Sequence, residues 1–220
     1  MTSPRVLFCD FGGVLTPPMT EGIAAVLRAV AVPAPALTAA INQVAHQCGG
    51  TRSMQPLERG LLTQQEWGHR VTAALRPHYV PAAPLTRFGD YLYTGRVLNH
   101  ALLTALGELR DRGMQIGLLT NSVREWEPHR AALMPDTELF TVQVKSHELG
   151  LCKPDPAIYR FAEQAVGTAP DDCLLIDDDP VNCAAARARG WTAIRHETTP
   201  ATLHRLHILY PQRTTALDDV

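Results

Sequence analysis

The chain has 220 residues, of which 45% are hydrophobic and 19% are charged, and its formal net charge is −2 at pH 7. These values are typical of a globular protein with one large core, or with a core that carries one sizeable insertion. The near-neutral charge argues against binding to nucleic acid or anionic lipid through a broad electrostatic surface. No apolar stretch reaches the roughly 20 residues that span a membrane, and residues 1–5 lack a signal-peptide pattern, so we expect a cytoplasmic protein.

The first predicted element is a strand over residues 6–9, which is followed by Asp10 and then by Gly12 and Gly13. A continuous apolar run of this length that ends in a glycine-containing turn is typical of a buried parallel strand. The same pattern recurs further along the chain and predicts three more strands, at residues 115–119, 141–144 and 173–176.

Residues 17–97 differ from the rest of the chain, because they contain alanine-rich and leucine-rich helical patterns and no convincing buried strand. The predicted helices cover residues 21–30, 36–46, 64–75 and 85–93. This segment begins just after the first strand and returns just before the next helix. We therefore predict a helical cap domain at 17–97 over the carboxyl end of the sheet, and a core domain made of residues 1–16 and 98–220.

Helical patterns alternate with the strands of this core, and each of them is followed by glycine, a frequent residue at the end of a helix. They cover residues 101–112, 156–166 and 182–189. A short strand at 192–195, a helix at 199–207 and a loosely ordered tail at 211–220 complete the prediction. The alternation predicts an α/β fold: a Rossmann-like parallel sheet with helices on both faces, plus the all-helical insertion.

Polar residues follow three of the predicted strands, namely Asp10, residues 120–122 and residues 177–179. Each group has an ordinary explanation as a turn or a helix cap. In a parallel sheet, however, they converge at one edge, where ligands bind. Together with Lys153, one of only two lysines, they supply the carboxylate, hydroxyl, ammonium and acidic pair that phosphoryl transfer through an aspartyl phosphate requires. Mg²⁺ would bring the carboxylate close to an anionic phosphate.

Four segments resemble, in order, the four motifs of the haloacid dehalogenase-like hydrolase superfamily. They are Asp10-Phe11-Gly12-Gly13-Val14-Leu15-Thr16, Leu118-Leu119-Thr120-Asn121-Ser122, Lys153-Pro154-Asp155-Pro156 and Ile176-Asp177-Asp178-Asp179-Pro180-Val181-Asn182. The helical insertion resembles the C1-type cap of subfamily I, which contains small-molecule phosphatases, 2-haloacid dehalogenases and the phosphatase domain of soluble epoxide hydrolases. The resemblance implies an Mg²⁺-dependent phosphatase that hydrolyses a small-molecule phosphate monoester.

The resemblance also implies catalytic and substrate-binding roles. Asp10 is expected to attack phosphorus, Thr120 to bind the transferring group, and Lys153 to balance the charge of the nucleophile and the phosphate. The residues expected to bind substrate are Gly13, Asn121 and Ser122.

The same resemblance implies a set of oxygen ligands for Mg²⁺. Asp178, Asp10 and the backbone carbonyl of Gly12 are expected to bind the metal directly, and Asp177 through a metal-bound water. Asn182 is expected to brace the acidic loop from behind.

One position departs from the family pattern. Most phosphatases of the superfamily carry a second aspartate two positions after the nucleophile, where it acts as general acid and base, and this chain has Gly12 there. A slow enzyme, a leaving group that needs little protonation, and a proton donor borrowed from the cap or the substrate are all consistent with glycine. His46, His69 and His147 are the candidate donors, although a structural role is the more ordinary interpretation of each.

Two other functions remain open at this point. A 2-haloacid dehalogenase would need neither the missing acid nor a metal, but Asp177 and Asp178 would then repel each other and an anionic substrate. A catalytically idle binding or regulatory protein would tolerate Gly12, but it would have no need for the cluster of like charges. The sequence does not identify the substrate or the oligomeric state.

Overall fold

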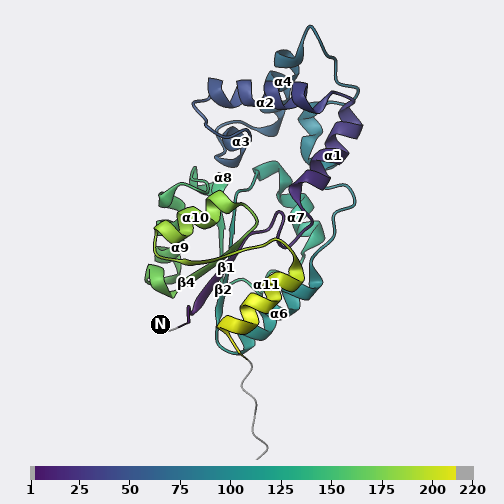
Figure 1. Ribbon diagram of the computed structural model, residues 1–220. Coiled ribbons are helices and arrows are strands. Elements are labelled where there is room, and N and C mark those ends of the chain that lie inside the picture. Colours follow the sequence, from purple (N-terminus) through teal and green to yellow (C-terminus); the bar gives the residue numbers. More distant parts are fainter. Residues whose placement is uncertain (1–2, 212–220) are drawn as a thin grey trace, which may run out of the picture.

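The computed structural model describes residues 3–211, and its centre is a five-stranded parallel sheet (Figure 1). The strands are β1 (Val6–Cys9), β2 (Gln115–Thr120), β3 (Val142–Lys145), β4 (Cys173–Asp177) and β5 (Thr192–Arg195). Their spatial order is β3-β2-β1-β4-β5, and every neighbouring pair is parallel. The predicted α/β Rossmann-like fold is confirmed.

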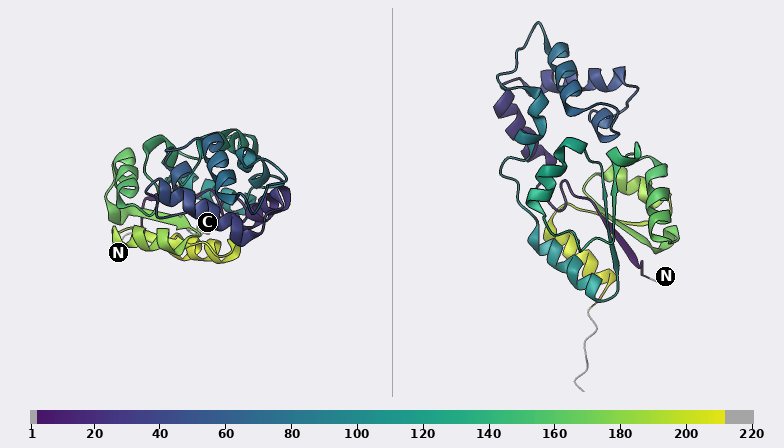
Figure 2. Two further views of the ribbon diagram at one scale, coloured as in Figure 1. Left: turned by 90° about the horizontal axis from the view of Figure 1, so that it is seen from above. Right: turned by 180° about the vertical axis from the view of Figure 1, so that it is seen from behind.

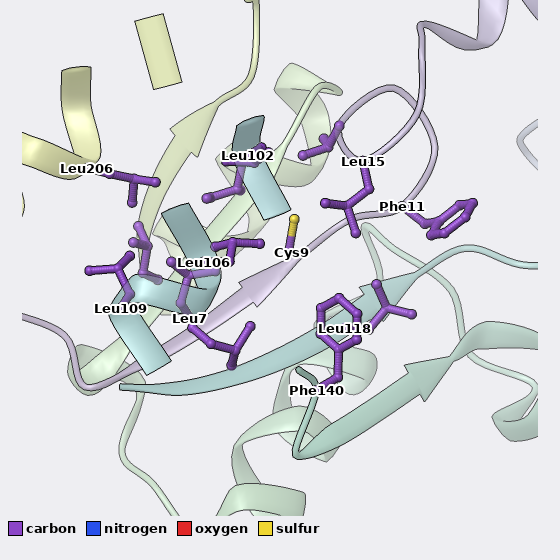
Figure 3. Close-up of a cluster of buried hydrophobic side chains, with 14 of the residues drawn as sticks. Leu7, Cys9, Phe11, Leu15, Leu102, Leu106, Leu109, Leu118, Phe140 and Leu206 are labelled. Atoms are coloured by element: carbon purple, nitrogen blue, oxygen red, sulfur yellow. The ribbon is translucent and has the colours of Figure 1, made fainter. Parts of the chain in front are cut away.

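Helices cover both faces of the sheet. Strand side chains alternate between the two faces, so each face carries apolar side chains that a helix can bury. Leu7 and Cys9 of β1 point to one face, where they pack against leucines of α6 (His100–Asp111) and α11 (Thr199–Leu209), as Figure 3 shows. Val6 and Phe8 point to the other face, toward α9 (Pro156–Val166) and α10 (Pro180–Ala188). Both faces are therefore apolar, which explains why β1 is a continuous hydrophobic run.

A second layer consists only of helices and lies beyond the carboxyl end of the strands, as the right view of Figure 2 shows. We call residues 19–92 the helical module. Its elements are α1 (Met19–Val30), α2 (Ala34–Gln47), α3 (Gln55–Glu58), α4 (Gln64–Leu75), the 3-10 helix η1 (Leu85–Arg87) and α5 (Phe88–Leu92). Its apolar cluster around Trp67, Phe88 and Val71 also includes Val123 and Trp126, which follow β2, so the module packs against the core through this cluster. The domain boundaries at 17 and 97 remain a prediction.

The two links between the module and the core run side by side. Asn99 donates its backbone N–H to the carbonyl of Leu15 (2.8 Å) and its side-chain amide to the carbonyl of Val14 (3.1 Å). Arg96 donates to the hydroxyl of Thr16 (2.6 Å) and to the carbonyl of Pro17. The ends of the inserted segment are thus tied together at one point of the core.

Some elements differ from the sequence prediction. The helix expected over 85–93 begins as the 3-10 turn η1, and the strand expected at 141–144 is shifted by one residue to Val142–Lys145. The sequence analysis missed α3, α7 (Glu127–Leu133) and α8 (Ser146–Leu149), together with the 3-10 turns η2 (Arg124–Trp126) and η3 (Pro170–Asp172). Most of these elements are shorter than two helical turns, so they have no measurable periodicity. Of the tail expected over 211–220, residues 212–220 lie outside the described residues.

Within residues 3–211 no single helix is long and apolar enough to cross a membrane. Only α1 and α2 taken together have the length and composition, and this pair is bent by 102° at its break.

Two mid-helix glycines have opposite surroundings, which generates a matched stability prediction. A Cβ at Gly68 of α4 would lie 2.5 Å from the backbone nitrogen of Thr86, whereas a Cβ at Gly107 of α6 would meet nothing within 4 Å. We expect Gly68→Ala to lower the free energy of unfolding by about 1–3 kcal/mol, because η1 must move away. Gly107→Ala should raise it by about 0.5–1 kcal/mol through helix propensity. Urea denaturation measures both, and a stabilised Gly68→Ala would contradict the close packing of α4 and η1.

Candidate active site

The carboxyl ends of the three central strands bring the predicted acidic and hydroxyl residues to one edge of the sheet. Cys9 pairs with Leu118 of β2 and with Ile176 of β4, so Asp10, Thr120 and Asp177 follow at nearly the same level. The chain passes from β1 to β2 and β3 on one side of the sheet and then crosses to β4 and β5 on the other side of β1. The strand order therefore reverses between β1 and β4. Such a point opens a crevice outside the strand ends, where ligands of α/β proteins bind.

The ammonium group of Lys153 is the centre of this edge. Its side chain is fully buried, and Nζ lies 3.0 Å from Oδ1 of Asp10, 2.6 Å from Oδ2 of Asp177 and 2.8 Å from the carbonyl oxygen of Leu119. An ammonium has three protons, so these three acceptors satisfy it completely. The loop between α8 and α9 places this lysine under the strand ends.

Burial and charge shift the pKa values of this pair in a coupled way. Burial raises the pKa of Asp10 to about 6, although Lys153 opposes the rise. Burial alone would lower the pKa of Lys153, but the carboxylates of Asp10 and Asp177 outweigh it and raise that pKa above its usual value. The lysine is therefore cationic at all ordinary pH values, and Asp10 is mostly ionised at neutral pH.

Three carboxylates at this edge could hold a metal ion. Asp10, Asp177 and Asp178 each offer one oxygen, and these oxygens lie within 4.8 Å of one another. Burial, followed by the charge of Asp177, raises the pKa of Asp178. One ammonium does not balance three carboxylates, and hard oxygen ligands of this kind suit Mg²⁺. The residues present therefore fit a divalent cation.

Asp177 and Asp178 have different surroundings. Asp177 is fully buried, and besides Lys153 it accepts from the N–H of Asp179 (2.9 Å) and from the side-chain amide of Asn182 (3.1 Å). Asp178 is only partly buried and lies against Gly13, whose φ is +80°. A Cβ at Gly13 would collide with the Asp178 carboxylate, so glycine is required where the first loop passes this acid.

The residues predicted to bind substrate differ from one another in their contacts. The side chain of Asn121 accepts from the N–H of Lys153 (2.8 Å) and donates to its carbonyl (3.0 Å), so it holds the lysine loop. Thr120 is buried beside it. The hydroxyl of Ser122 is fully buried and lies 2.6 Å from Nδ1 of His147. This contact fixes the loop that follows β2. The substrate-binding roles of Gly13, Asn121 and Ser122 remain predictions.

The histidines considered as proton donors lie in unsuitable places. His46 and His69 are exposed on α2 and α4. His147 is buried against Ser122, and burial lowers its pKa. At Gly12, where the family pattern has an acid, the thioether sulfur of Met19 would lie 3.1 Å from a Cβ.

Two residues of the helical module reach the strand ends. Arg52 forms an ion pair with Asp179 at 2.6 Å. Glu58, which the sequence analysis missed, lies at the end of α3 with Oε2 3.4 Å from Nδ2 of Asn121. Burial raises the pKa of Glu58 to about 7, an effect that Arg52 and Lys153 partly oppose. A helix of four residues gives no sequence signal for the direction of this side chain.

A cavity of about 580 Å³ opens beside this edge. It is lined by Gly13, Asp178 and residues of both links and of the β5–α11 loop, including Thr16, Asn99 and Thr199. Solvent therefore reaches the acidic loop from the side where the module joins the core.

Comparison with known proteins gives a consistent family match. The model of the haloacid dehalogenase-like hydrolase family matches residues 4–190. A phosphoserine phosphatase from Thermus thermophilus is 33% identical over 90 residues, which are 40% of this chain and 36% of that protein. The chain thus spans well under half of that relative's length.

Solved structures share the fold at low sequence identity. A family enzyme from Bacteroides thetaiotaomicron, solved with magnesium and inorganic phosphate, has a TM-score of 0.60 and 19% identity, covering 87% of this chain and 93% of that one. The L-2-haloacid dehalogenase from Xanthobacter autotrophicus has a TM-score of 0.59 and 17% identity, covering 94% and 82%. At these identities the likeness concerns the fold.

The buried lysine generates a prediction about stability and pH. In Lys153→Met, Asp10 and Asp177 face each other without a cation, so we expect a loss of about 3–5 kcal/mol at neutral pH. Loss of the ammonium raises the pKa of Asp10 further above its value in the unfolded chain. Stability of the variant therefore falls as pH rises, and its deficit against the unmodified protein is larger at about pH 8 than at about pH 5.

Urea denaturation in the presence of a chelator measures this deficit. Lys145→Met is the control, because Lys145 is the other lysine and its pair with Glu127 is partly exposed. Its effect should stay within about 1 kcal/mol at both pH values. A pH-independent deficit in Lys153→Met would contradict the assigned ion pairs.

Proposed function

Since the chain belongs to the haloacid dehalogenase-like hydrolase family, we propose that it is an Mg²⁺-dependent phosphatase that hydrolyses a small-molecule phosphate monoester through an aspartyl phosphate on Asp10. The observation that carries this proposal is the cluster of three carboxylates around one buried ammonium. The similarity to a phosphoserine phosphatase supports the same reaction class.

Asp10 is the proposed nucleophile. Its Oδ1 is held by Lys153 and by the N–H of Phe11 (2.8 Å), which fixes the orientation of the carboxylate. Within residues 3–211, Oδ2 has no hydrogen-bond partner, so this oxygen is available for attack or for binding the metal. The pKa of about 6 leaves Asp10 mostly ionised at neutral pH, as a carboxylate nucleophile requires.

Asp10, Asp178 and the carbonyl of Gly12 are the proposed ligands of Mg²⁺, with Asp177 acting through water. When bound, the ion neutralises the acidic cluster and the phosphate, so that two anions can approach each other. Asn182 and Lys153 hold Asp177 in place. Thr120 and the Asn121 loop are the proposed contacts of the transferring phosphoryl group.

Residues 17–97 are the proposed cap domain, of the C1 type. The helical module lies directly beyond the strand ends (Figure 2), so its residues face the part of the substrate that leaves. Substrate choice is accordingly assigned to the module, and attack on phosphorus and metal binding are assigned to the core.

A dehalogenase remains the alternative to be tested, because proteins of that activity share the fold. The repulsion between Asp177 and Asp178 argues against it, since a metal-free reaction leaves that repulsion unrelieved.

Hydrolysis of p-nitrophenyl phosphate and of a panel of metabolite phosphate esters tests the proposal. Turnover should need Mg²⁺, disappear with a chelator and return when Mg²⁺ is restored. Asp10→Asn should lower kcat at least about 10³-fold, since it removes the nucleophile, while the circular dichroism spectrum stays unchanged. Hydrolysis of 2-chloropropionate in chelator would favour the dehalogenase, and full turnover by Asp10→Asn would exclude the nucleophile. No turnover on any ester, with no binding of beryllofluoride, would favour an idle binding protein.

A further inference from the structure

At position 12 the proposed reaction lacks the proton donor of the family pattern, because Gly12 has no side chain. A phosphate ester of an alcohol needs one, since an alkoxide is a poor leaving group until it is protonated. The space beside Gly12 faces the thioether of Met19, which cannot supply a proton. The donor must therefore come from another element that reaches the strand ends.

The direction of the reaction indicates where that donor lies. Displacement at phosphorus is in line, so the leaving oxygen lies opposite the attacking oxygen. Asp10 attacks from the carboxyl end of β1, and the leaving oxygen therefore points away from the sheet, toward the helical module. Figure 1 shows that α3 is the module helix next to α8, which begins directly after β3, and the two helices are in contact.

We propose that Glu58, at the end of α3, is the general acid and base of this site and takes the place of the residue that Gly12 lacks. The proposal rests on the proposed phosphatase function. Oε2 of Glu58 lies 3.4 Å from Nδ2 of Asn121, whose side chain holds the backbone of Lys153. Glu58 is thus connected through one residue to the lysine that pairs with Asp10.

The charges around Glu58 leave it free to exchange a proton. Arg52 of the module and Lys153, Asp10 and Asp179 of the core face it. Arg52 is paired with Asp179 at 2.6 Å, and no cation within residues 3–211 lies in ion-pair distance of Glu58. Burial dominates, and the resulting pKa of about 7 allows both protonation states at neutral pH.

Each half of the reaction balances with this assignment. In the first half, a carboxylate oxygen of Asp10 bonds to phosphorus, the bond from phosphorus to the ester oxygen breaks, and protonated Glu58 gives its proton to that oxygen. The products are the alcohol, the aspartyl phosphate and a Glu58 carboxylate. In the second half, Glu58 takes a proton from water as the water oxygen bonds to phosphorus. Asp10 is released as a carboxylate with inorganic phosphate, and Glu58 is again protonated.

Glu58→Gln tests the assignment, because it keeps the size of the side chain and removes its titration. We expect kcat/KM on an alkyl phosphate such as glycerol phosphate to fall about 10²–10⁴-fold. With p-nitrophenyl phosphate, whose leaving group needs little protonation, the first half of the reaction, transfer of the phosphoryl group to Asp10, should persist. Water attack then lacks its base, so the variant should release a burst of one nitrophenolate per enzyme before a slow steady state.

The pH dependence provides a second readout. For the unmodified protein, kcat/KM on the alkyl phosphate should fall as pH rises above about 7, because the acid must be protonated. This limb should be absent in Glu58→Gln, and Glu58→Asp should keep it at a lower rate. Glu21→Gln is the control, because it makes the same charge change on the exposed surface of α1 in the same module. It should leave kcat/KM on both substrates unchanged.

The outcomes separate this inference from the proposed function. If the unmodified protein hydrolyses esters and Asp10→Asn does not, an equal loss on both substrates in Glu58→Gln, without a burst or a lost pH limb, overturns the role of Glu58 alone. If the unmodified protein hydrolyses no ester, the proposed function fails and this inference with it. A selective loss on the alkyl phosphate with a burst supports both.

Discussion

The ion pairs of Lys153 with Asp10 and Asp177 are the constraint on which the site depends. Removing charged groups from water is costly, and the cost is offset only when each partner is fully satisfied. The three acceptors of the ammonium meet this condition, and they come from the ends of β1, β2 and β4. The lysine therefore ties the three central strands together at the edge where the chemistry is proposed. The third carboxylate, Asp178, remains without a cation of the protein in this network, which explains why the edge favours a divalent ion.

Much of the core could be predicted from the sequence because its signals are local. A strand covered on both faces is a continuous apolar run, as in residues 6–9 and 173–176, and the glycines after α6, α9 and α10 mark helix ends. The acids at the strand ends followed from the parallel topology. Lys153 lies in a loop with no such signal, and it was singled out by the scarcity of lysine and by the resemblance to a family.

The module contributions could not be predicted in the same way. Periodicity shows that a helix has an apolar face, but it does not show which polar residue faces a neighbouring domain. Arg52 lies in a loop and Glu58 in a helix of four residues, so periodicity cannot predict the direction of either side chain. The contact that places Glu58 near Asn121 joins residues 63 positions apart, and it exists only once the module has packed over the core. The same holds for Ser122, whose partner His147 belongs to the unpredicted helix α8.

The clamp formed by Asn99 and Arg96 on residues 14–17 has an evolutionary consequence. It holds the two ends of the inserted segment together whatever lies between them, and loop closure becomes only about 0.6 kcal/mol more costly each time the length doubles. Lineages can therefore lengthen, shorten or exchange the insert while the ancestral sheet and its ion pairs stay unaltered. Specificity can in this way diversify while the nucleophile and its ion pairs persist, whereas a proton donor that the insert carries, as proposed for Glu58, must be kept or replaced along with it.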